Sequence, residues 1–140
     1  MMKYILMLWM AFHVGIYRLT GGKLGGSMGG YKLLLLTTTG RKSGKAHTNP
    51  VGCFDHKDGY VIVASNRGQP NNPAWYHNLK SNPRVTVQVL DKVMSATAEV
   101  LSGEARAQAW QQVIATAPSY AKYEKHSTRE IPLVLLRPSK

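Results

Sequence analysis

Residues 84–90, RVTVQVL, alternate apolar and polar side chains without interruption. Such alternation is typical of a half-buried strand, because successive side chains of a strand point to opposite faces. Asp91 and Lys92 then supply a turn, and residues 93–100, VMSATAEV, continue as a second extended segment. This stretch predicts an antiparallel hairpin, which restricts the chain to folds that contain such a sheet.

Other extended segments surround this hairpin. Residues 33–39, LLLLTTT, predict a buried strand, and residues 46–54 follow as a second one after a short basic loop. Asp58 and Gly59 mark a turn into residues 60–65, YVIVAS, so these segments predict a hairpin with a five-residue loop, 55–59. Residues 131–136, IPLVLL, form the last predicted strand.

Short helices are expected between the hairpins. In residues 71–83, NNPAWYHNLKSNP, Asn72 is the expected N-cap and Pro73 the first helical residue. Ser102 is the expected cap of a longer helix that ends before Pro118, and residues 119–127 continue as a short helical segment. The inner face of the longer helix is formed by Trp110, Val113, Ile114 and Ala117.

About six strands with short helical crossovers predict a mainly β, α+β domain built as an antiparallel barrel. The length of 140 residues fits one domain. Cys53 is the only cysteine, so no intramolecular disulfide can form, and no Cys/His spacing is that of a metal site. A reducing, cytoplasmic setting is the simplest expectation.

The N-terminal region has its own composition. Residues 4–17, YILMLWMAFHVGIY, are apolar apart from His13 and too short for a comfortable membrane span. A helix that packs on the domain or covers a site is expected, with a membrane-surface helix or a cleaved signal as alternatives. Six glycines in residues 20–30 predict a flexible connector, so the chain divides into an N-terminal helix with this connector, residues 1–30, and a barrel domain, residues 31–140.

The loop in TTTGRKSGK, residues 37–45, favours an anion. Arg41 can bind two oxygens at once, while Lys42 and Lys45 add point charges and Ser43 adds a hydroxyl. The two glycines would allow backbone N–H groups to form an anion-binding nest. The loop is not a P-loop, because three residues rather than four separate its glycines. A solvated basic turn is the alternative interpretation.

Two further segments can line a pocket. Residues 64–79, ASNRGQPNNPAWYHNL, bring together a strand end, a Gly/Pro loop and a helix N-terminus, with Ser65 and Trp75 as polar and aromatic candidates. Tyr120 and Tyr123 share one helix face and could donate an O–H to a bound carbonyl. Trp75 and the tyrosine pair could equally be core aromatics.

The five histidines are scattered and the seven acidic residues dispersed, so no acid–base cluster is visible in the sequence. An anion-binding loop without such a cluster indicates that a bound cofactor carries the chemistry. The net charge of +11 favours an acidic ligand, an anionic lipid surface or nucleic acid.

In order, LLLLTTTGRKSGK, YVIVASNRGQPNNPAWYHNLKSNPRVTVQV and PSYAKYEKHSTREIPLVLL resemble the deazaflavin-dependent nitroreductase family of coenzyme F420-dependent reductases. The resemblance covers roughly residues 33–138. It implies a split β-barrel of the flavin-reductase type that binds F420, a deazaflavin with a phosphate and an acidic oligoglutamate tail, and no metal. It further implies hydride transfer from the reduced deazaflavin to a quinone or nitro compound.

The resemblance also assigns residues to the site. Arg41, Lys42 and Ser43 would hold the phosphate, Ser65 would lie near the deazaflavin ring, and Tyr120 and Tyr123 would face ring and substrate as catalytic residues. The rest of the cofactor would be lined by His47, Thr48, Asn49, Pro50, Val51, Gly52, Val63, Ala64, Asn66, Ala74, Trp75, Tyr76, His77 and Asn78.

One position departs from the family pattern. Ala117 stands where relatives often carry a tyrosine, so a wider pocket with one hydroxyl fewer is expected, and reduction of bulky nitroimidazoles is less expected than quinone reduction. The alternatives are an FMN-binding split-barrel oxidoreductase, a small basic nucleic-acid-binding barrel and a non-catalytic cofactor carrier. The expected location is cytoplasmic, with peripheral contact at the inner membrane face as a second possibility through the N-terminal helix.

Overall fold

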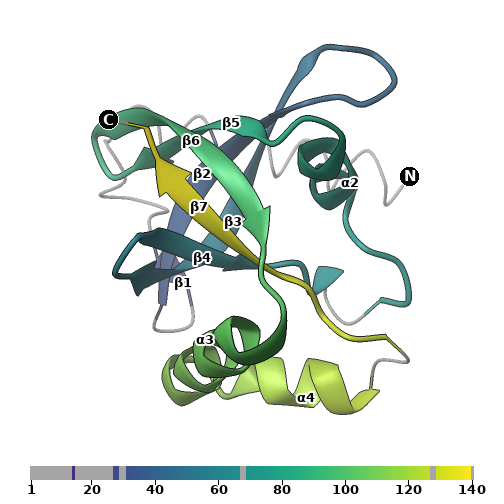
Figure 1. The fold of residues 1–140 in the computed structure, drawn as a ribbon, viewed down its shortest axis with the longest axis vertical. Helices are drawn as coiled ribbons and strands as arrows, with labels where there is room; N and C mark the ends of the chain where they lie inside the picture. Colours follow the sequence, from purple (N-terminus) through teal and green to yellow (C-terminus); the bar gives the residue numbers. More distant parts are fainter. Residues whose placement is uncertain (1–13, 15–26, 29–30, 67–68, 127–128, 140) are drawn as a thin grey trace.

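The computed structural model describes residues 14, 27–28, 31–66, 69–126 and 129–139. Antiparallel hairpins are separated by short helices along this chain, as the sequence predicts (Figure 1). The elements are β1 (Ser27–Met28), β2 (Tyr31–Thr39), β3 (Ala46–His56), β4 (Gly59–Val63), α2 (Ala74–Ser81), β5 (Arg84–Val89), β6 (Lys92–Val100), α3 (Gly103–Thr116), α4 (Ser119–His126) and β7 (Leu133–Pro138).

Every strand pairing is antiparallel, and the sheet closes on itself. The strand order is β1-β2-β3-β4-β7-β6-β5, and an additional pairing of β2 with β5 completes a barrel of β2 to β7. Leu36 of β2 lies opposite Val87 of β5 in this closing ladder. The predicted class, an antiparallel split barrel with helical crossovers, is therefore confirmed.

Strand β2 has two different partners along one edge. Its first residues, Tyr31 and Lys32, pair with Met28 and Ser27 of β1. Further along, residues 35–37 pair with residues 86–88 of β5. The part of this edge of β2 that β5 does not reach is therefore paired with β1.

The β3–β4 hairpin is tighter than the sequence predicts. His56 pairs with Gly59, so the connection has two residues, Lys57 and Asp58, and the expected five-residue loop is wrong. The N–H of Asp58 donates to Nδ1 of His56 at 3.0 Å, which closes the turn. Gly59 has φ +150°, and a Cβ there would overlap the carbonyl oxygen of Leu136, so this turn requires glycine.

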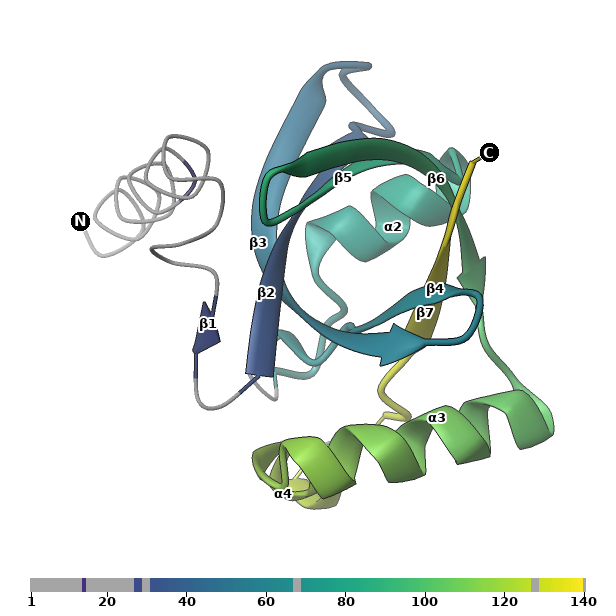
Figure 2. The same ribbon diagram turned by 90° about the vertical axis from the view of Figure 1, so that its left-hand side faces the viewer.

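The apolar runs of β2 and β7 are explained by two cores on opposite faces of the barrel wall. Inside the barrel lie Leu34, Leu36, Ile62 and Leu136, all fully buried. The second core lies outside, where α3 and α4 cover one side of the barrel, and it contains Phe54, Val61, Val63, Trp110, Val113, Leu133 and Leu135 (Figures 1 and 2).

Helix α2 lies in one opening of the barrel (Figure 2). Trp75, Tyr76 and Leu79 belong to the interior core, which accounts for the orientation of the helix. Its N-cap is Pro73 rather than the predicted Asn72, and no side chain caps the helix. Oδ1 of Asn72 instead accepts a hydrogen bond from Arg129 at 2.6 Å. Asn72 therefore holds a loop rather than a helix end.

The predicted inner face of α3 is confirmed. Trp110, Val113 and Ala117 are buried, and Ile114 packs against the same outer core. Ser102 stands at the N-cap position as expected, although its side chain makes no cap hydrogen bond.

The predicted N-terminal helix and most of the glycine connector lie outside the described residues. Val14 is described, and it packs with Leu33 and Leu35 on the outer face of β2. Within the described ranges, no helix has both the length and the apolar character needed to cross a membrane.

Candidate functional site

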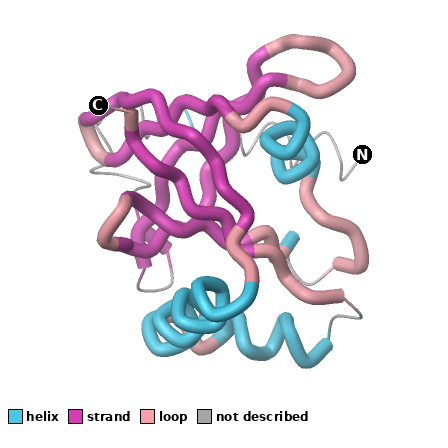
Figure 3. The backbone as a smooth tube through the Cα atoms, viewed as in Figure 1, coloured by secondary structure: helices cyan, strands magenta, loops and turns pink. Residues whose placement is uncertain are grey.

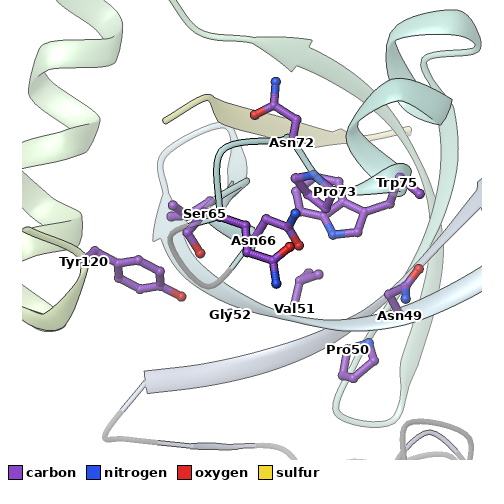
Figure 4. A pocket seen from close by; sticks show the side chains of 13 residues that line it. Asn49, Pro50, Val51, Gly52, Ser65, Asn66, Asn72, Pro73, Trp75 and Tyr120 are labelled. Atoms are coloured by element: carbon purple, nitrogen blue, oxygen red, sulfur yellow. The ribbon is translucent and has the colours of Figure 1, made fainter. Parts of the chain in front are cut away.

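Two adjoining cavities lie between β3, α2 and the loops beside them. The first, about 490 Å³, is lined by Asn49, Pro50, Val51, Gly52, Val63, Ser65, Asn66, Gln69, Asn72, Pro73, Ala74, Trp75 and Tyr120 (Figure 4). The second, about 610 Å³, is lined by Gly40, Arg41, Lys42, Ser43, Ala46, His47, Thr48, Asn49, Ala74, Trp75 and Asn78. Because Asn49, Ala74 and Trp75 line both, one ligand can extend from the first cavity into the second.

The first cavity is lined by apolar and polar side chains together, and Trp75 and Tyr120 are its aromatic members. Figure 4 shows the Tyr120 ring reaching from α4 toward Val51 and Gly52 of β3, with Ser65 and Asn66 nearby. The ring is fixed by edge-to-face contacts with Phe54 and Tyr123, each with centroids 5.9 Å apart. Fixed aromatic side chains beside polar groups can hold and orient a flat organic ligand.

The second cavity is cationic because the β2–β3 loop forms one of its walls. This loop, residues 40–45, projects beyond the barrel (Figure 3), and Arg41 and Lys42 are exposed on it. Oγ of Ser43 lies 3.5 Å from Nε2 of His47 on the neighbouring strand. The second cavity can therefore bind an anion through side chains.

The N–H groups of Gly40, Gly44 and Lys45 do not form the predicted anion-binding nest, because each of them bonds within the loop. The N–H of Gly40 donates to Lys45 O and that of Gly44 to Gly40 O, both at 2.8 Å. The N–H of Lys45 donates to Oγ of Ser43 at 3.2 Å. These N–H groups bond within the loop, so they define its shape, and Gly44, at φ +72°, allows the chain to reverse.

Asn78 anchors the basic loop to the barrel. This side chain of α2 is buried, with 7% of its surface exposed. Its Oδ1 accepts the N–H of Arg41 at 3.1 Å, and its Nδ2 donates to Oγ1 of Thr38 at 3.2 Å. One amide thus joins the helix, the strand and the loop, and it fixes the backbone from which the Arg41 side chain extends.

Replacing Asn78 by alanine is expected to lower the free energy of unfolding by about 2 kcal/mol, because a buried hydroxyl and a backbone N–H lose their partners. Urea denaturation measures this change. Asn82→Ala is the matched control, since Oδ1 of Asn82 accepts an exposed hydrogen bond from the N–H of Arg84. Equal losses in the two variants would contradict the anchoring role of Asn78.

Most residues that the resemblance assigns to the site line one of the two cavities. Four do not: Ala64 and Tyr76 are buried, His77 lies at the edge of the Tyr76 ring, and Tyr123 contacts the Tyr120 ring. Ala117 is also outside the lining and is 3% exposed in the outer core. It shares this core with Tyr120, which lines the first cavity, and the wider pocket stays a prediction.

Sequence reasoning missed Arg129. This residue follows α4, and its guanidinium contacts the loop that carries Ser65 and Asn66, with a bond of 3.0 Å from Nη2 to Ser65 O. Partial burial lowers the pKa of Arg129 from its usual value, although a guanidinium stays protonated in proteins. No local pattern marks this residue, because its partners are far away in sequence. Gln69, Asn72, Pro73 and Gly40 also line the cavities; they lie within the predicted segments but were not assigned individually, and Ala46 at the start of β3 was not predicted.

Cys53 is not part of the site. Its side chain is 2% exposed in the interior core. Burial raises the pKa of the thiol from 9.0 to about 12; nearby Lys32 lowers it and Asp55 raises it further. Only the thiolate is nucleophilic, so this cysteine is chemically inert in the folded protein.

Alkylation of Cys53 by iodoacetamide at pH 8 is expected to be about tenfold slower or more in the folded protein than in urea. The raised pKa of the Cys53 thiol also makes the free energy of unfolding depend on pH. Above pH 9.0 the unfolded thiol loses its proton while the folded one keeps it until about 12, so this contribution to stability falls as pH rises through that window. Equal alkylation rates in native and unfolded protein would contradict the burial.

The charges at the site have one sign. In the described part of the chain, no Asp or Glu lines either cavity. Among the same residues, no group of three His, Cys, Asp or Glu side chains could hold a metal ion. The arrangement can bind an anion at one end, enclose a flat ring at the other and offer hydroxyl groups to it. Its described lining residues include no carboxylate for general acid–base catalysis.

A closed split barrel with a cationic cavity beside an aromatic one defines a class of protein, the cofactor-binding oxidoreductases of the flavin-reductase-like fold. The profile of one family in this class, F420H(2)-dependent quinone reductase, matches residues 9–138. The chain belongs to this family. The resemblance seen in the sequence, the oxidoreductase class and the dependence on coenzyme F420 are thereby confirmed.

Individual relatives agree with this placement. An F420H(2)-dependent quinone reductase of Mycobacterium tuberculosis strain H37Rv is 38% identical over 91% of this chain and 95% of its own length. A solved F420-H2 dependent reductase, FDR-A, is 40% identical, with a TM-score of 0.70 over 75% of this chain and 93% of its own. A structure described as a domain-swapped dimer is 36% identical, with a TM-score of 0.73 over 91% of this chain and 96% of its own.

Proposed function

We propose that this protein transfers a hydride from reduced coenzyme F420 to a quinone. The observation that carries the proposal is the pair of adjoining cavities, one cationic and one walled by aromatic and apolar side chains. The coenzyme has the same two parts, an anionic side arm and a flat ring. Nitro compounds are the second acceptor class that the predicted hydride chemistry allows.

The residues present fit the proposed cofactor. Arg41, Lys42 and Ser43 would hold the phosphate, because guanidinium and ammonium groups form charge-assisted hydrogen bonds with its oxygens. The excess of positive charge suits the acidic tail. The remaining lining residues named by the resemblance would line the rest of the cofactor, and Trp75, which lines both cavities, would lie where ring and side arm join.

When bound, the reduced deazaflavin supplies a hydride rather than single electrons. The protein has to hold the acceptor against the ring, exclude water and provide a donor for the acceptor oxygen. A quinone that gains a hydride and a proton becomes a hydroquinone, and negative charge develops on oxygen during the transfer. We assign stabilisation of that charge to the hydroxyl groups of Ser65 and Tyr120, both of which line the first cavity.

Tyr123 supports the site in a different way. Its ring contacts that of Tyr120 at 5.9 Å, while the cavity is lined by Tyr120 alone of the pair. We propose that Tyr123 holds the Tyr120 ring in place and that Tyr120 is the one in contact with the acceptor.

The test is anaerobic mixing of the protein with reduced F420 and a panel of quinones and nitroaromatics, with oxidation of the cofactor followed by its absorbance. Quinone-dependent oxidation that exceeds the rate without protein is expected. Binding of reduced F420 without turnover of any acceptor would identify a carrier instead. Tight binding of FMN without binding of F420 would overturn the cofactor assignment.

A further inference from the structure

The guanidinium of Arg129 makes five hydrogen bonds to the described residues of one loop beside the first cavity. Nη1 donates to Asn72 Oδ1 at 2.6 Å and to Ala64 O at 3.3 Å. Nη2 donates to Ser65 O at 3.0 Å and to Asn71 O at 3.2 Å. Nε donates to Gln69 O at 3.3 Å. Four of the five acceptors are backbone carbonyl oxygens, so the arginine fixes the path of the chain.

This loop carries a large share of the cavity wall. Ser65, Asn66, Gln69 and Asn72 all line the first cavity, and all lie within the stretch that Arg129 contacts. Because the carbonyl of Ser65 is bound to Arg129, the orientation of the Ser65 peptide is set by the guanidinium. Arg129 itself is not part of the lining, so it acts on the cavity through these residues.

One residue of the loop, Asn66, has a left-handed backbone conformation. Asn66 has φ +49°, in the left-handed region that few residues other than glycine adopt. Its Nδ2 donates to Asn71 O at 2.8 Å, and its carbonyl accepts the N–H of Gln69 at 3.1 Å. These bonds close the loop on itself, whereas Arg129 ties it to the segment that leads from α4 into β7.

We propose that Arg129 is a positioning residue for the reduction: it holds the loop of residues 64–66 and 69–72 so that Ser65 and Asn72 face the acceptor. The assignment of a reaction rests on the proposed function, but the ordering of the loop does not. The planar guanidinium, with five N–H groups in fixed directions, suits five separate acceptors. An ammonium has three donors and cannot hold the same set.

If Arg129 positions this loop, replacing Arg129 should affect the two cavities differently. The basic loop of residues 40–45 is anchored by Asn78, not by Arg129. Loss of the guanidinium should therefore disturb the first cavity, where the acceptor would bind, while the second, anion-binding cavity keeps its geometry. A residue that only stabilised the fold would affect both ends together.

The experiment compares Arg129→Gln and Arg129→Lys with Arg137→Gln. Arg137 is the matched control, because it is an exposed arginine that pairs with Glu99 at 3.0 Å and Asp58 at 3.5 Å, away from both cavities. Amide hydrogen exchange of the cofactor-free protein is measured for peptides that contain residues 64–66 and 69–72 and for peptides of the barrel strands. Affinity for F420 and acceptor-dependent kcat and KM are then measured.

In Arg129→Gln, we expect exchange in the loop peptides to rise about tenfold with the strands unchanged, since local opening becomes easier. We expect kcat/KM for the acceptor to fall about tenfold or more and F420 affinity to fall by a smaller factor, because the ring loses part of its wall while the basic loop keeps its anchor on Asn78. Arg129→Lys should lie between this variant and the wild type, and Arg137→Gln should match the wild type.

Loop exchange within twofold of the wild type in Arg129→Gln would overturn the proposal, and so would equally faster exchange in loop and strands. The exchange measurement needs no turnover. If the wild type failed to reduce any acceptor, the proposed function would fall while the ordering of the loop by Arg129 could still be demonstrated.

Discussion

Replacing Arg41 and Lys42 together by alanine is expected to weaken F420 binding about a hundredfold and to leave the fold intact. Each charge-assisted hydrogen bond to an anion contributes about 1.5 kcal/mol or more, and 1.4 kcal/mol corresponds to a tenfold change in affinity. Both side chains are exposed, so their removal leaves no unpaired buried group. Titration of the cofactor, followed by its fluorescence, measures the loss.

The control variant changes the net charge by the same amount as the Arg41/Lys42 variant. Arg84→Ala with Lys92→Ala also removes two exposed cations, one at the start of β5 and one at the start of β6. Neither residue lines the two cavities. This control should bind F420 within about threefold of the wild type at moderate salt, where long-range charge effects are screened. Equal losses in both variants would attribute binding to net charge and remove the basic loop from the site.

Replacing Tyr120 by phenylalanine is the second large expected effect. The change removes one hydroxyl and keeps the ring that packs against Phe54 and Tyr123. Loss of one donor to a developing oxyanion typically lowers the rate by about 10² to 10³, so kcat for quinone reduction should fall while the cofactor affinity changes little. Steady-state kinetics with varied quinone, together with cofactor titration, separate the two quantities.

Tyr123→Phe tests whether the hydroxyl of Tyr120 is the one that matters. It is the same substitution one helical turn further along α4, on a residue outside the cavity lining. We expect its kcat to stay within about threefold of the wild type, because the ring that packs against Tyr120 is kept and the hydroxyl that is removed belongs to a residue outside the cavity lining. An unchanged rate in Tyr120→Phe would exclude the tyrosine from the chemistry.

The fold could be predicted largely from local patterns. Alternation in residues 84–90 and the apolar runs of β2 and β7 indicate strands with the correct faces, because the side-chain period of a strand is fixed by its backbone. The errors lie at element ends. The β3–β4 turn is shorter than expected since pairing extends to His56 and Gly59, and α2 begins after Pro73, while the side chain of Asn72 bonds to Arg129.

The candidate site could be predicted where its residues are close together in sequence. The basic loop, the segment around Trp75 and the tyrosines of α4 each form a recognisable local group, and each reaches a cavity. Arg129 could not be found in this way, since its acceptors lie 57 to 65 residues earlier in the chain. Tyr76 was assigned to the ligand although it faces the interior core, because sequence alone does not give the rotation of a short helix.

Asn49, Ala74 and Trp75 form a wall common to the two cavities, which has a thermodynamic consequence for any ligand long enough to occupy both. Once one half of such a molecule is attached, the other half is confined near its own subsite at an effective concentration of about millimolar or more. The gain depends on the spacing between the halves. A fragment that carries only one half does not gain this effective concentration. The binding free energies of two such fragments therefore add up to less than the binding free energy of the linked molecule.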